Sequence, residues 1–323
     1  MKTIEELRQF YDAVLLEDLQ ILEDKRRRVV NSFIITAAIV LAAGIAGFAI
    51  TTGMGGPAPV AFVLPVVGLI TGGIVFGVRR RDYAGDFKAR IISQLVYFVD
   101  RNLTYNARAC ISQPEYMASK IFRQRPDRYK GDDYVSGRIG ATQIEFSEVH
   151  SEYKTTSTDS KGRTQTHWHT IFKGLFFIAD FNKHFTCEVF VLPDTAEKLF
   201  GRLGQKLQSL NVFRGQLVKL EDPEFERLFA VYGNDQIQAR YILSTSLMDR
   251  ITNFKKKSGR PVHLSFVGSK VYVAISYGKD LFEPRIFSTL LDFRPIQEYF
   301  EDLQLAVGIV EGLSLNTRIW SKS

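Results

Sequence analysis

The sequence has few of the residues that build disulfide frameworks, zinc clusters and nucleophilic active sites. It contains only two cysteines and five histidines among 323 residues. Cys110 and Cys187 lie far apart and neither belongs to a CxxC pair, which excludes a zinc-finger pattern. The sequence also has no GxSxG nucleophile elbow and no GxxxxGK[ST] phosphate loop. These absences exclude the enzyme classes that depend on those motifs.

Charged residues are missing from one long stretch. Between Val29 and Val78 the sequence has no Asp, Glu, Lys or Arg. A turn rich in Gly and Pro, Gly53–Pro57, divides the stretch into apolar halves at 31–52 and 59–78. As a helix, each half of about 20 residues would cross a hydrocarbon core of about 30 Å. We therefore expect a transmembrane helical hairpin. Because neither half contains an ionisable residue, the sequence excludes a transporter or proton relay.

Basic residues gather at both ends of the uncharged stretch. Cytoplasmic flanks of membrane spans are enriched in Lys and Arg, so the two clusters place both termini in the cytoplasm. A secretory signal peptide fits poorly, since a basic cluster also follows the second span. We expect the same clusters to contact anionic lipid headgroups, at about 1 kcal/mol per basic residue. These membrane-flanking residues are Lys25, Arg26, Arg27, Arg28, Arg79, Arg80 and Arg81.

The net charge of the chain comes from these clusters. The sequence has 42 Lys and Arg residues against 35 Asp and Glu residues, a formal net charge of +7. Without the two clusters, the basic and acidic residues would be equal in number. A nucleic-acid-binding protein needs a basic face of its own, and nothing in the sequence demands one. We therefore expect no nucleic acid partner.

The hairpin separates two other parts of the chain. Residues 1–30 predict an amphipathic cytoplasmic helix, and residues 31–78 form the transmembrane hairpin. Residues 82–323 are long enough to fold into one large cytoplasmic domain or two smaller ones. Strand-turn-strand patterns recur on either side of residue 221, which marks a possible subdivision.

Residues 82–323 mix helical and strand patterns. Residues 262–275 alternate apolar and other residues about a Gly-Ser turn, which predicts a β-hairpin. The mixture of helices with antiparallel hairpins predicts an α+β fold. Further strands are predicted at 142–147, 166–180, 185–192 and 238–243; helices at 87–98, 195–210 and 247–254 and after Pro295; and helix caps at Thr3 with Glu6 and at Asp222 with Pro223.

Seven short motifs are spread along this part of the chain. They are GDDY (Gly131–Tyr134), FKGLFFIADFNK (Phe172–Lys183), VLPD (Val191–Asp194), KLEDPEFE (Lys219–Glu226), ARYIL (Ala239–Leu243), SFVGSKVYVAIS (Ser265–Ser276) and NTRIW (Asn316–Trp320). Together they resemble the DUF3137 family. The resemblance implies an uncharacterised bacterial protein of the inner (plasma) membrane, with an N-terminal membrane hairpin and a cytoplasmic domain. It implies no known activity, so no catalytic or cofactor-binding residue is carried over.

Three of the five histidines lie near one predicted hairpin. If that hairpin is centred near residue 160, His150 faces His169 across the strands, and His167 lies two residues away on the same face. Three imidazoles on one face, with Glu148 nearby, would be zinc ligands. The alternative is a solvated polar hairpin tip, since a one-residue shift in register scatters the group. We predict no metal and no cofactor, and keep the three histidines as candidates.

Three functions agree with these observations. The first is a membrane-anchored interaction or scaffold module without catalysis, which follows from a folded domain that lacks a recognisable catalytic constellation. The second is a metal-dependent enzyme that uses the three histidines, and the third is a lipid-recognition domain. The expected partners are the lipid bilayer and a protein of unknown identity. A second copy of the chain is a further candidate, because Gly68 and Gly72 have the spacing of closely packed membrane helices.

Overall fold

The computed structural model divides the chain into two compact units. We call the first the helical unit; it contains Lys2–Leu95 together with Phe282–Tyr299. The second, the sheet unit, contains Val96–Leu281 and the chain from Phe300 onward. The residues that the structure describes are 2–53, 60–158, 162–180, 186–194 and 215–315.

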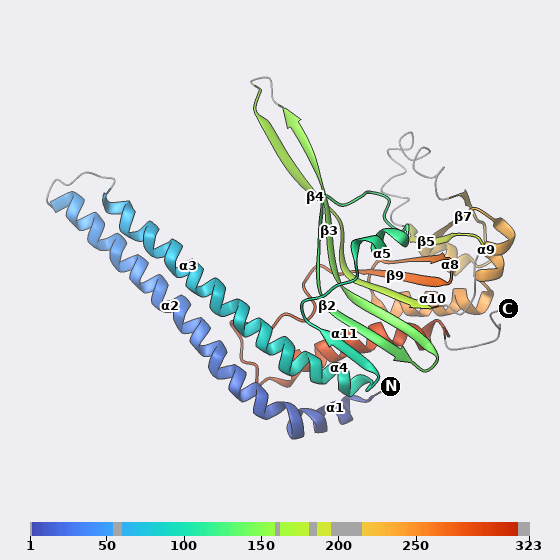
Figure 1. Ribbon diagram of the computed structural model, residues 1–323, viewed down its shortest axis with the longest axis horizontal. Coiled ribbons are helices and arrows are strands. Elements are labelled where there is room, and N and C mark those ends of the chain that lie inside the picture. The colour runs from blue at the N-terminus through green and yellow to red at the C-terminus, as the bar shows by residue number, and fades with distance from the viewer. Residues whose placement is uncertain (1, 54–59, 159–161, 181–185, 195–214, 316–323) are drawn as a thin grey trace. The chain divides into compact units, whose positions relative to one another are not determined.

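The helical unit begins with an almost unbroken run of helix (Figure 1). The predicted capping box is confirmed, since the Thr3 Oγ1 accepts from the Glu6 backbone N–H at 3.1 Å and the Glu6 carboxylate accepts from the Thr3 N–H at 2.8 Å. The run comprises α1 (Ile4–Phe10), the π-helical turn η1 (Tyr11–Leu15) and α2 (Leu16–Gly53), and the chain returns through α3 (Val60–Phe87), the π-helical turn η2 (Lys88–Ile92) and α4 (Ser93–Val99).

Helices α2 and α3 lie side by side and run in opposite directions (Figure 1). The rings of Phe33 and Phe76 meet with their centroids 5.5 Å apart. A Cβ atom at Gly72 would lie 1.9 Å from the Thr36 Cγ2, so only glycine allows the two helices to approach this closely there. The small-residue spacing therefore serves the packing of α2 on α3.

One helix of the described chain, Ile4–Ala49, is long and apolar enough to cross a membrane. Within its most apolar stretch of 18 residues, only 11% is buried, whereas a core helix of a soluble protein is mostly buried. Large apolar side chains on both helices are exposed, including Leu41 and Phe48 on α2 and Leu69 and Ile74 on α3. The uncharged stretch thus turns its apolar surface outward.

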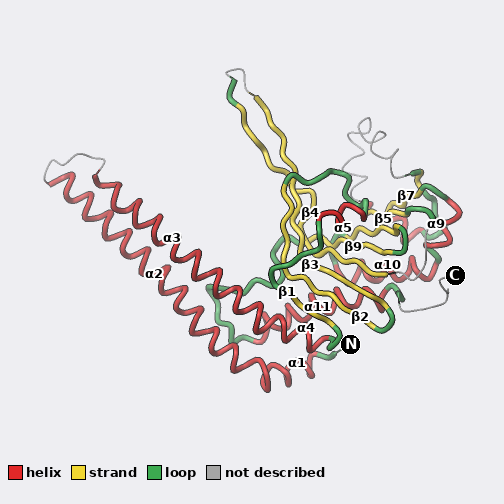
Figure 2. Tube along the Cα trace, in the orientation of Figure 1, coloured by secondary structure: helices red, strands yellow, loops and turns green. Residues whose placement is uncertain are grey.

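The sheet unit is built on an antiparallel sheet of nine strands among the described residues (Figure 2). The strand order is β1-β2-β3-β4-β9-β8-β5-β7-β6. Strands from both sides of residue 221 belong to this one sheet, and a subdivision there stays a prediction. The strands are β1 (Leu103–Asn106), β2 (Arg128–Ile139), β3 (Thr142–Thr158), β4 (Thr164–Asp180), β5 (Val189–Pro193), β6 (Gln216–Leu217), β7 (Phe229–Gly233), β8 (Val262–Val267) and β9 (Lys270–Ser276).

Helices complete the core of the sheet unit. Tyr116 of the short helix α5 is buried against β4, with its ring centroid 5.1 Å from that of Phe176. Phe300 on α11 is fully buried. The other helices are α8 (Pro223–Leu228), α9 (Gln236–Ile242) and α10 (Thr245–Ser258); α5 covers Gln113–Ala118, and α11 (Phe293–Gly312) begins in the helical unit.

The sequence predicts most of these elements correctly. The α+β mixture of helices and antiparallel strands is confirmed, as are the hairpin at 262–275 (β8 and β9) and the helix after Pro295. The Asp222 side chain caps α8, whose first residue is Pro223. The strand expected at 238–243 is wrong, and the helix expected at 195–210 lies outside the described residues.

The wrong strand has a local cause. Asp235 accepts hydrogen bonds from the backbone N–H groups of Ile237 and Gln238, at 2.9 and 3.0 Å, and so starts helix α9 instead. Ala239 and Ile242, three residues apart, are the buried positions of this helix. A short apolar run does not by itself distinguish a strand from a helix, and here the cap decides.

The close approach of β2 to β3 at Gly131 generates a stability prediction. A Cβ atom there would lie 2.3 Å from the Glu148 carbonyl oxygen and 2.7 Å from the Cys110 Cβ. Gly131→Ala is therefore expected to lower the free energy of unfolding by about 1–3 kcal/mol. Thermal melting of the sheet signal in circular dichroism measures the loss. Gly278→Ala is the control, because no atom lies within 4 Å of its added methyl group; equal melting of both variants would contradict the prediction.

Candidate functional site

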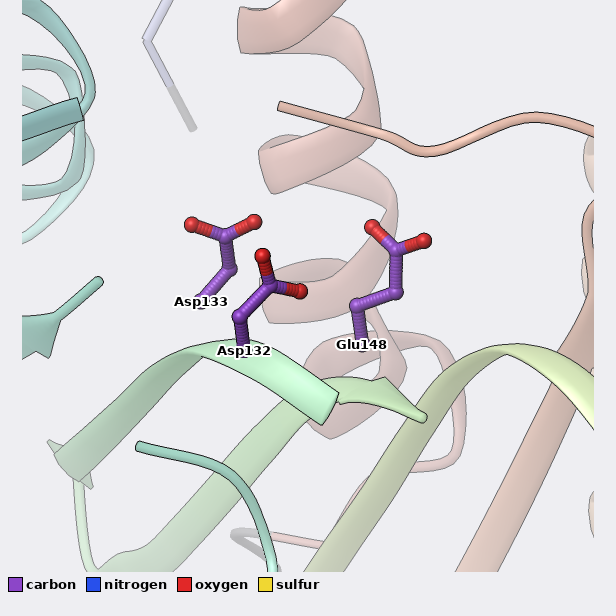
Figure 3. A group of neighbouring side chains, drawn as sticks. All are labelled: Asp132, Asp133 and Glu148. Atoms are coloured by element: carbon purple, nitrogen blue, oxygen red, sulfur yellow. The ribbon is translucent and has the colours of Figure 1, made fainter. Parts of the chain in front are cut away.

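Three carboxylates converge between β2 and β3. Figure 3 shows the side chains of Asp132, Asp133 and Glu148 pointing the same way from the two strands. One oxygen of each lies within 4.8 Å of the others. Asp133 and Glu148 are buried, and Asp132 is half-buried. This is the tightest grouping of potential metal ligands in the part of the chain that the structure describes.

The backbone explains how two consecutive aspartates reach one side of the sheet. Asp132 pairs with Glu148 in the β2–β3 register, so their side chains lie on the same face. The next residue of a regular strand would point to the other face. The register shifts between Asp132 and Val135, and Asp133 has a left-handed φ of 57°. This bulge turns the Asp133 side chain toward its neighbours.

Each buried carboxylate has a hydrogen-bond donor. The Leu281 backbone N–H donates to Glu148 Oε2 at 2.9 Å. The Tyr105 hydroxyl donates to Asp133 Oδ1. Asp280, a further carboxylate near Glu148, forms an ion pair with Lys173 at 2.8 Å. The donors hold the side chains of Glu148 and Asp133 in place, and neither donor carries a positive charge.

Burial raises the pKa of Glu148 from 4.5 to about 8. The Leu281 N–H opposes this rise, whereas the charges of Asp132, Asp280 and Asp133 add to it. Near neutral pH, Glu148 therefore holds a proton. Two changes relieve the repulsion among these carboxylates: a proton on Glu148, or a divalent cation such as Mg²⁺ or Ca²⁺, which prefers oxygen ligands.

The three candidate histidines are not brought together. The expected register is wrong, because His169 pairs with Tyr153, while His150 pairs with Lys173. A register shift between Ser151 and Glu152 adds to the separation. The ring of His169 stacks on Tyr153 at 4.9 Å, and its Nε2 lies 2.8 Å from the Thr155 hydroxyl.

The ends of β3 and β4 form an exposed arm, which we call the ribbon, at residues 153–158 and 164–170. Strand β2 pairs with β3 only as far as Glu152, and β9 pairs with β4 only from Gly174 onward. Beyond those points the two strands pair only with each other and project from the sheet (Figure 1). His167 lies exposed on this ribbon. Neither edge of the ribbon pairs with another described strand, although the Lys154 N–H donates to the Asp127 carboxylate at 2.8 Å.

The basic residues that flank the uncharged stretch lie in the helical unit. Lys25 forms an ion pair with Asp86 of α3, and Arg26 and Arg27 both bind Glu23, at 2.7 and 3.3 Å. Arg79 donates to the Ser32 hydroxyl across the helix pair. The other flanking residues, Arg28, Arg80 and Arg81, are exposed.

In the sequence, Asp132 and Asp133 stood out only as part of the GDDY motif, and Glu148 had only a supporting place near the histidines. Their grouping depends on the β2–β3 register and on a left-handed aspartate, neither of which a single sequence displays. A signal was nevertheless present: Asp residues follow Gly131 directly, and Gly often marks a bulge or a close backbone approach within a strand.

The shifted pKa of Glu148 predicts a pH-dependent stability. The folded chain holds the proton more tightly than the unfolded chain, so the free energy of unfolding should fall as the pH rises from about 4.5 to about 8. Glu148→Gln is neutral at every pH and should remove this fall. Thermal melting measured across that pH range is the test, with exposed Glu221→Gln as the control.

An equal pH slope in the parent chain and in Glu148→Gln would contradict this prediction. All samples contain a chelator, because a divalent cation that binds the deprotonated carboxylates would stabilise the fold at high pH and hide the slope.

Comparison with known proteins finds a match to a family model, to which no activity is attached. A family model described as "Protein of unknown function (DUF3137)" matches residues 170–315. No curated protein matches the chain. A crystal structure of the mycobacterial trehalose monomycolate transport factor A, TtfA, aligns with 67% of this chain and 94% of its own, with 8% identity and a TM-score of 0.32. A likeness of that degree carries no argument about function. This match supports the resemblance seen in the motifs between Phe172 and Ser276, and it covers a little less than half of the chain, residues 170–315.

Proposed function

We propose that α2 and α3 anchor this chain in a bacterial inner membrane, where its sheet unit binds a protein partner without catalysing a reaction. The observation that carries the anchor is the outward-facing apolar surface of both helices. Ile39 and Leu41 on α2 and Ile70 and Ile74 on α3 are each more than half exposed. Soluble monomers rarely expose so large an apolar surface. Hydrocarbon is the environment in which such side chains are stable.

The ends of the helix pair support one orientation. Arg79 of α3 donates to Ser32 of α2, so the two basic clusters lie at the same end of the antiparallel pair. Positive charges concentrate on the cytoplasmic side of membrane proteins. In this arrangement both termini and the sheet unit are cytoplasmic, and the end of α2 near Thr52 faces the other side.

The ribbon is the surface that we propose for the partner. It exposes backbone N–H and C=O groups along both edges, and a two-stranded hairpin alone is only marginally stable. Its side chains are mainly hydroxyl-bearing, with Thr156 facing Thr166 and Thr158 facing Thr164 across the strands. A partner strand that pairs with either edge would satisfy these backbone groups.

One cleft favours the lipid-recognition alternative. It lies between α10 and α11 and has a volume of about 370 Å³. Arg250 and Lys257 supply two positive charges against the one negative charge of Glu311, while Phe254 and Leu305 supply apolar surface. This combination suits an anionic amphiphile. Lipid analysis of the purified chain tests it: a lipid retained by the parent chain and lost from Lys257→Glu would support the alternative.

Cysteine labelling tests the anchor and its orientation. In a Cys110→Ala/Cys187→Ala background, Thr52→Cys at the end of α2 should react with a membrane-impermeant maleimide added to intact spheroplasts. Thr245→Cys on α10 is exposed and should react only after the membrane is permeabilised. Labelling of both positions before permeabilisation, or removal of the chain from membranes by an alkaline wash, would contradict the proposal.

Photo-crosslinking tests the ribbon. A photoreactive amino acid at Thr166 in native membranes should give a discrete adduct with one partner protein, because this residue lies on the ribbon with its side chain exposed. Thr245, an exposed threonine outside the ribbon, is the matched control. Shortening both ribbon strands by the same number of residues should abolish binding of that partner. Equal labelling at the two positions, or none, would exclude the ribbon as the contact surface.

A further inference from the structure

The later segment of the helical unit, Phe282–Tyr299, places an aromatic side chain against Phe33 on α2. Phe287 belongs to the segment Phe282–Asp292, which precedes α11. Its ring centroid lies 5.9 Å from that of Phe33, and Phe33 in turn contacts Phe76. The Phe287 side chain is nevertheless 70% exposed. A large aromatic ring is thus left exposed beside the Phe33 and Phe76 pair of the uncharged stretch.

Hydrogen bonds hold this segment firmly to α2 and α3. Arg26 donates to the Ile286 carbonyl oxygen at 2.8 Å, and the Tyr83 hydroxyl donates to the Arg285 carbonyl oxygen at 3.3 Å. The Leu290 N–H donates to the buried carboxylate of Glu23 at 3.0 Å. The bonds lie on both sides of Phe287 along the chain. They fix its backbone, so the exposure of its ring is a property of the fold.

Ion pairs at either end of the segment add to this attachment. The buried ammonium of Lys88 lies 2.8 Å from the Glu283 carboxylate. Arg285 forms a two-pronged pair with Glu298 on α11, at 2.7 and 2.8 Å. The Tyr11 hydroxyl donates to the Leu291 carbonyl oxygen at 3.0 Å. The segment is therefore built into the helical unit along its whole length.

The helix geometry gives the depth of these rings relative to the basic clusters. At 1.5 Å per residue, Phe33 lies about 7.5 Å beyond Arg28, and Phe76 lies about 4.5 Å before Arg79. The headgroup region on each side of a bilayer is about 5–7 Å thick. If the guanidinium groups lie among the headgroups, both rings lie where the headgroups meet the hydrocarbon. Phe side chains on the apolar face of interfacial segments insert to about this depth, at the boundary of headgroups and acyl chains.

We propose that the segment Phe282–Asp292 is an interfacial anchor, with Phe287 inserted among the lipids beside α2 and α3. The inference rests on the proposed membrane anchor and adds a third contact with the bilayer. Charge favours lipid over a protein as the occupant. Arg27, Arg28 and Arg80 are exposed around the same level, where anionic phospholipid headgroups would neutralise them. The apolar surface of Phe287 is also continuous with that of Phe33.

Depth-dependent fluorescence quenching tests the anchor in the full-length chain. The two natural tryptophans are replaced in a Trp168→Phe/Trp320→Phe background, and Phe287→Trp supplies the single reporter. The protein is reconstituted into vesicles of phosphatidylglycerol and brominated phosphatidylcholine. Bromine atoms near the glycerol end of the acyl chains should quench this reporter more strongly than bromine atoms near the chain terminus. Its exposure means that the substitution should leave the fold intact.

Two control reporters in the same unit separate the possible results. Phe76→Trp reports whether α3 is in the bilayer at all. Val14→Trp, on η1, is 45% exposed and lies about 28 Å from Phe33 along the helical path, so it should not be quenched.

The pattern of quenching decides between the inference and the function on which it rests. Quenching of the Phe76 and Phe287 reporters, without the Val14 reporter, supports the interfacial anchor. Quenching at Phe76 alone overturns the interfacial anchor and leaves the membrane anchor standing. An unquenched Phe76 reporter overturns the membrane anchor, and the interfacial anchor with it.

Discussion

The carboxylate of Glu23 joins parts of the chain that are 267 residues apart in the sequence. It accepts hydrogen bonds from Arg26 and Arg27 on its own helix and from the backbone of Leu290. Mainly because of the bond from Arg26, its pKa falls from 4.5 to about 2, so it stays charged at physiological pH. A buried charge is tolerated only where it is paired. The position of the segment around Leu290 on α2 thus depends on this cluster.

Two buried glutamates, Glu23 and Glu148, differ in how the protein surrounds them, and their pKa values shift in opposite directions. Glu23 is surrounded by two guanidinium groups and keeps its charge. Glu148 lies beside Asp132 and Asp133, with a single backbone donor, and so its pKa rises instead. The cluster around Glu23 holds the segment at Leu290 against α2 through a hydrogen bond. The cluster around Glu148 brings three carboxylates together between two strands, where a proton on Glu148 reduces their mutual repulsion. The proposed binding surface, the ribbon, continues from those same strands.

Most local signals were read correctly from the sequence, whereas most distant contacts were not. The caps at Thr3 and Asp222 depend on residues no more than three positions apart, so the sequence displays them directly. The cap at Asp235 is equally local but was missed, because the apolar residues after it also fit a strand. The histidine group failed because strand register depends on a bulge that the sequence does not show. Gly131 is the one sequence signal for the left-handed Asp133, and the bond from Leu290 to Glu23 has none.

The discontinuity of the helical unit has a consequence for biosynthesis. Residues 2–95 leave the ribosome roughly 190 residues before residue 282 is made. At about 5–20 residues per second, this delay is about 10–40 s. During that time the ammonium of Lys88 lacks Glu283 as its ion-pair partner, and Glu23 lacks the Leu290 N–H. In the proposed membrane arrangement, α2 and α3 would therefore enter the bilayer before the segment 282–299 is available to complete their unit.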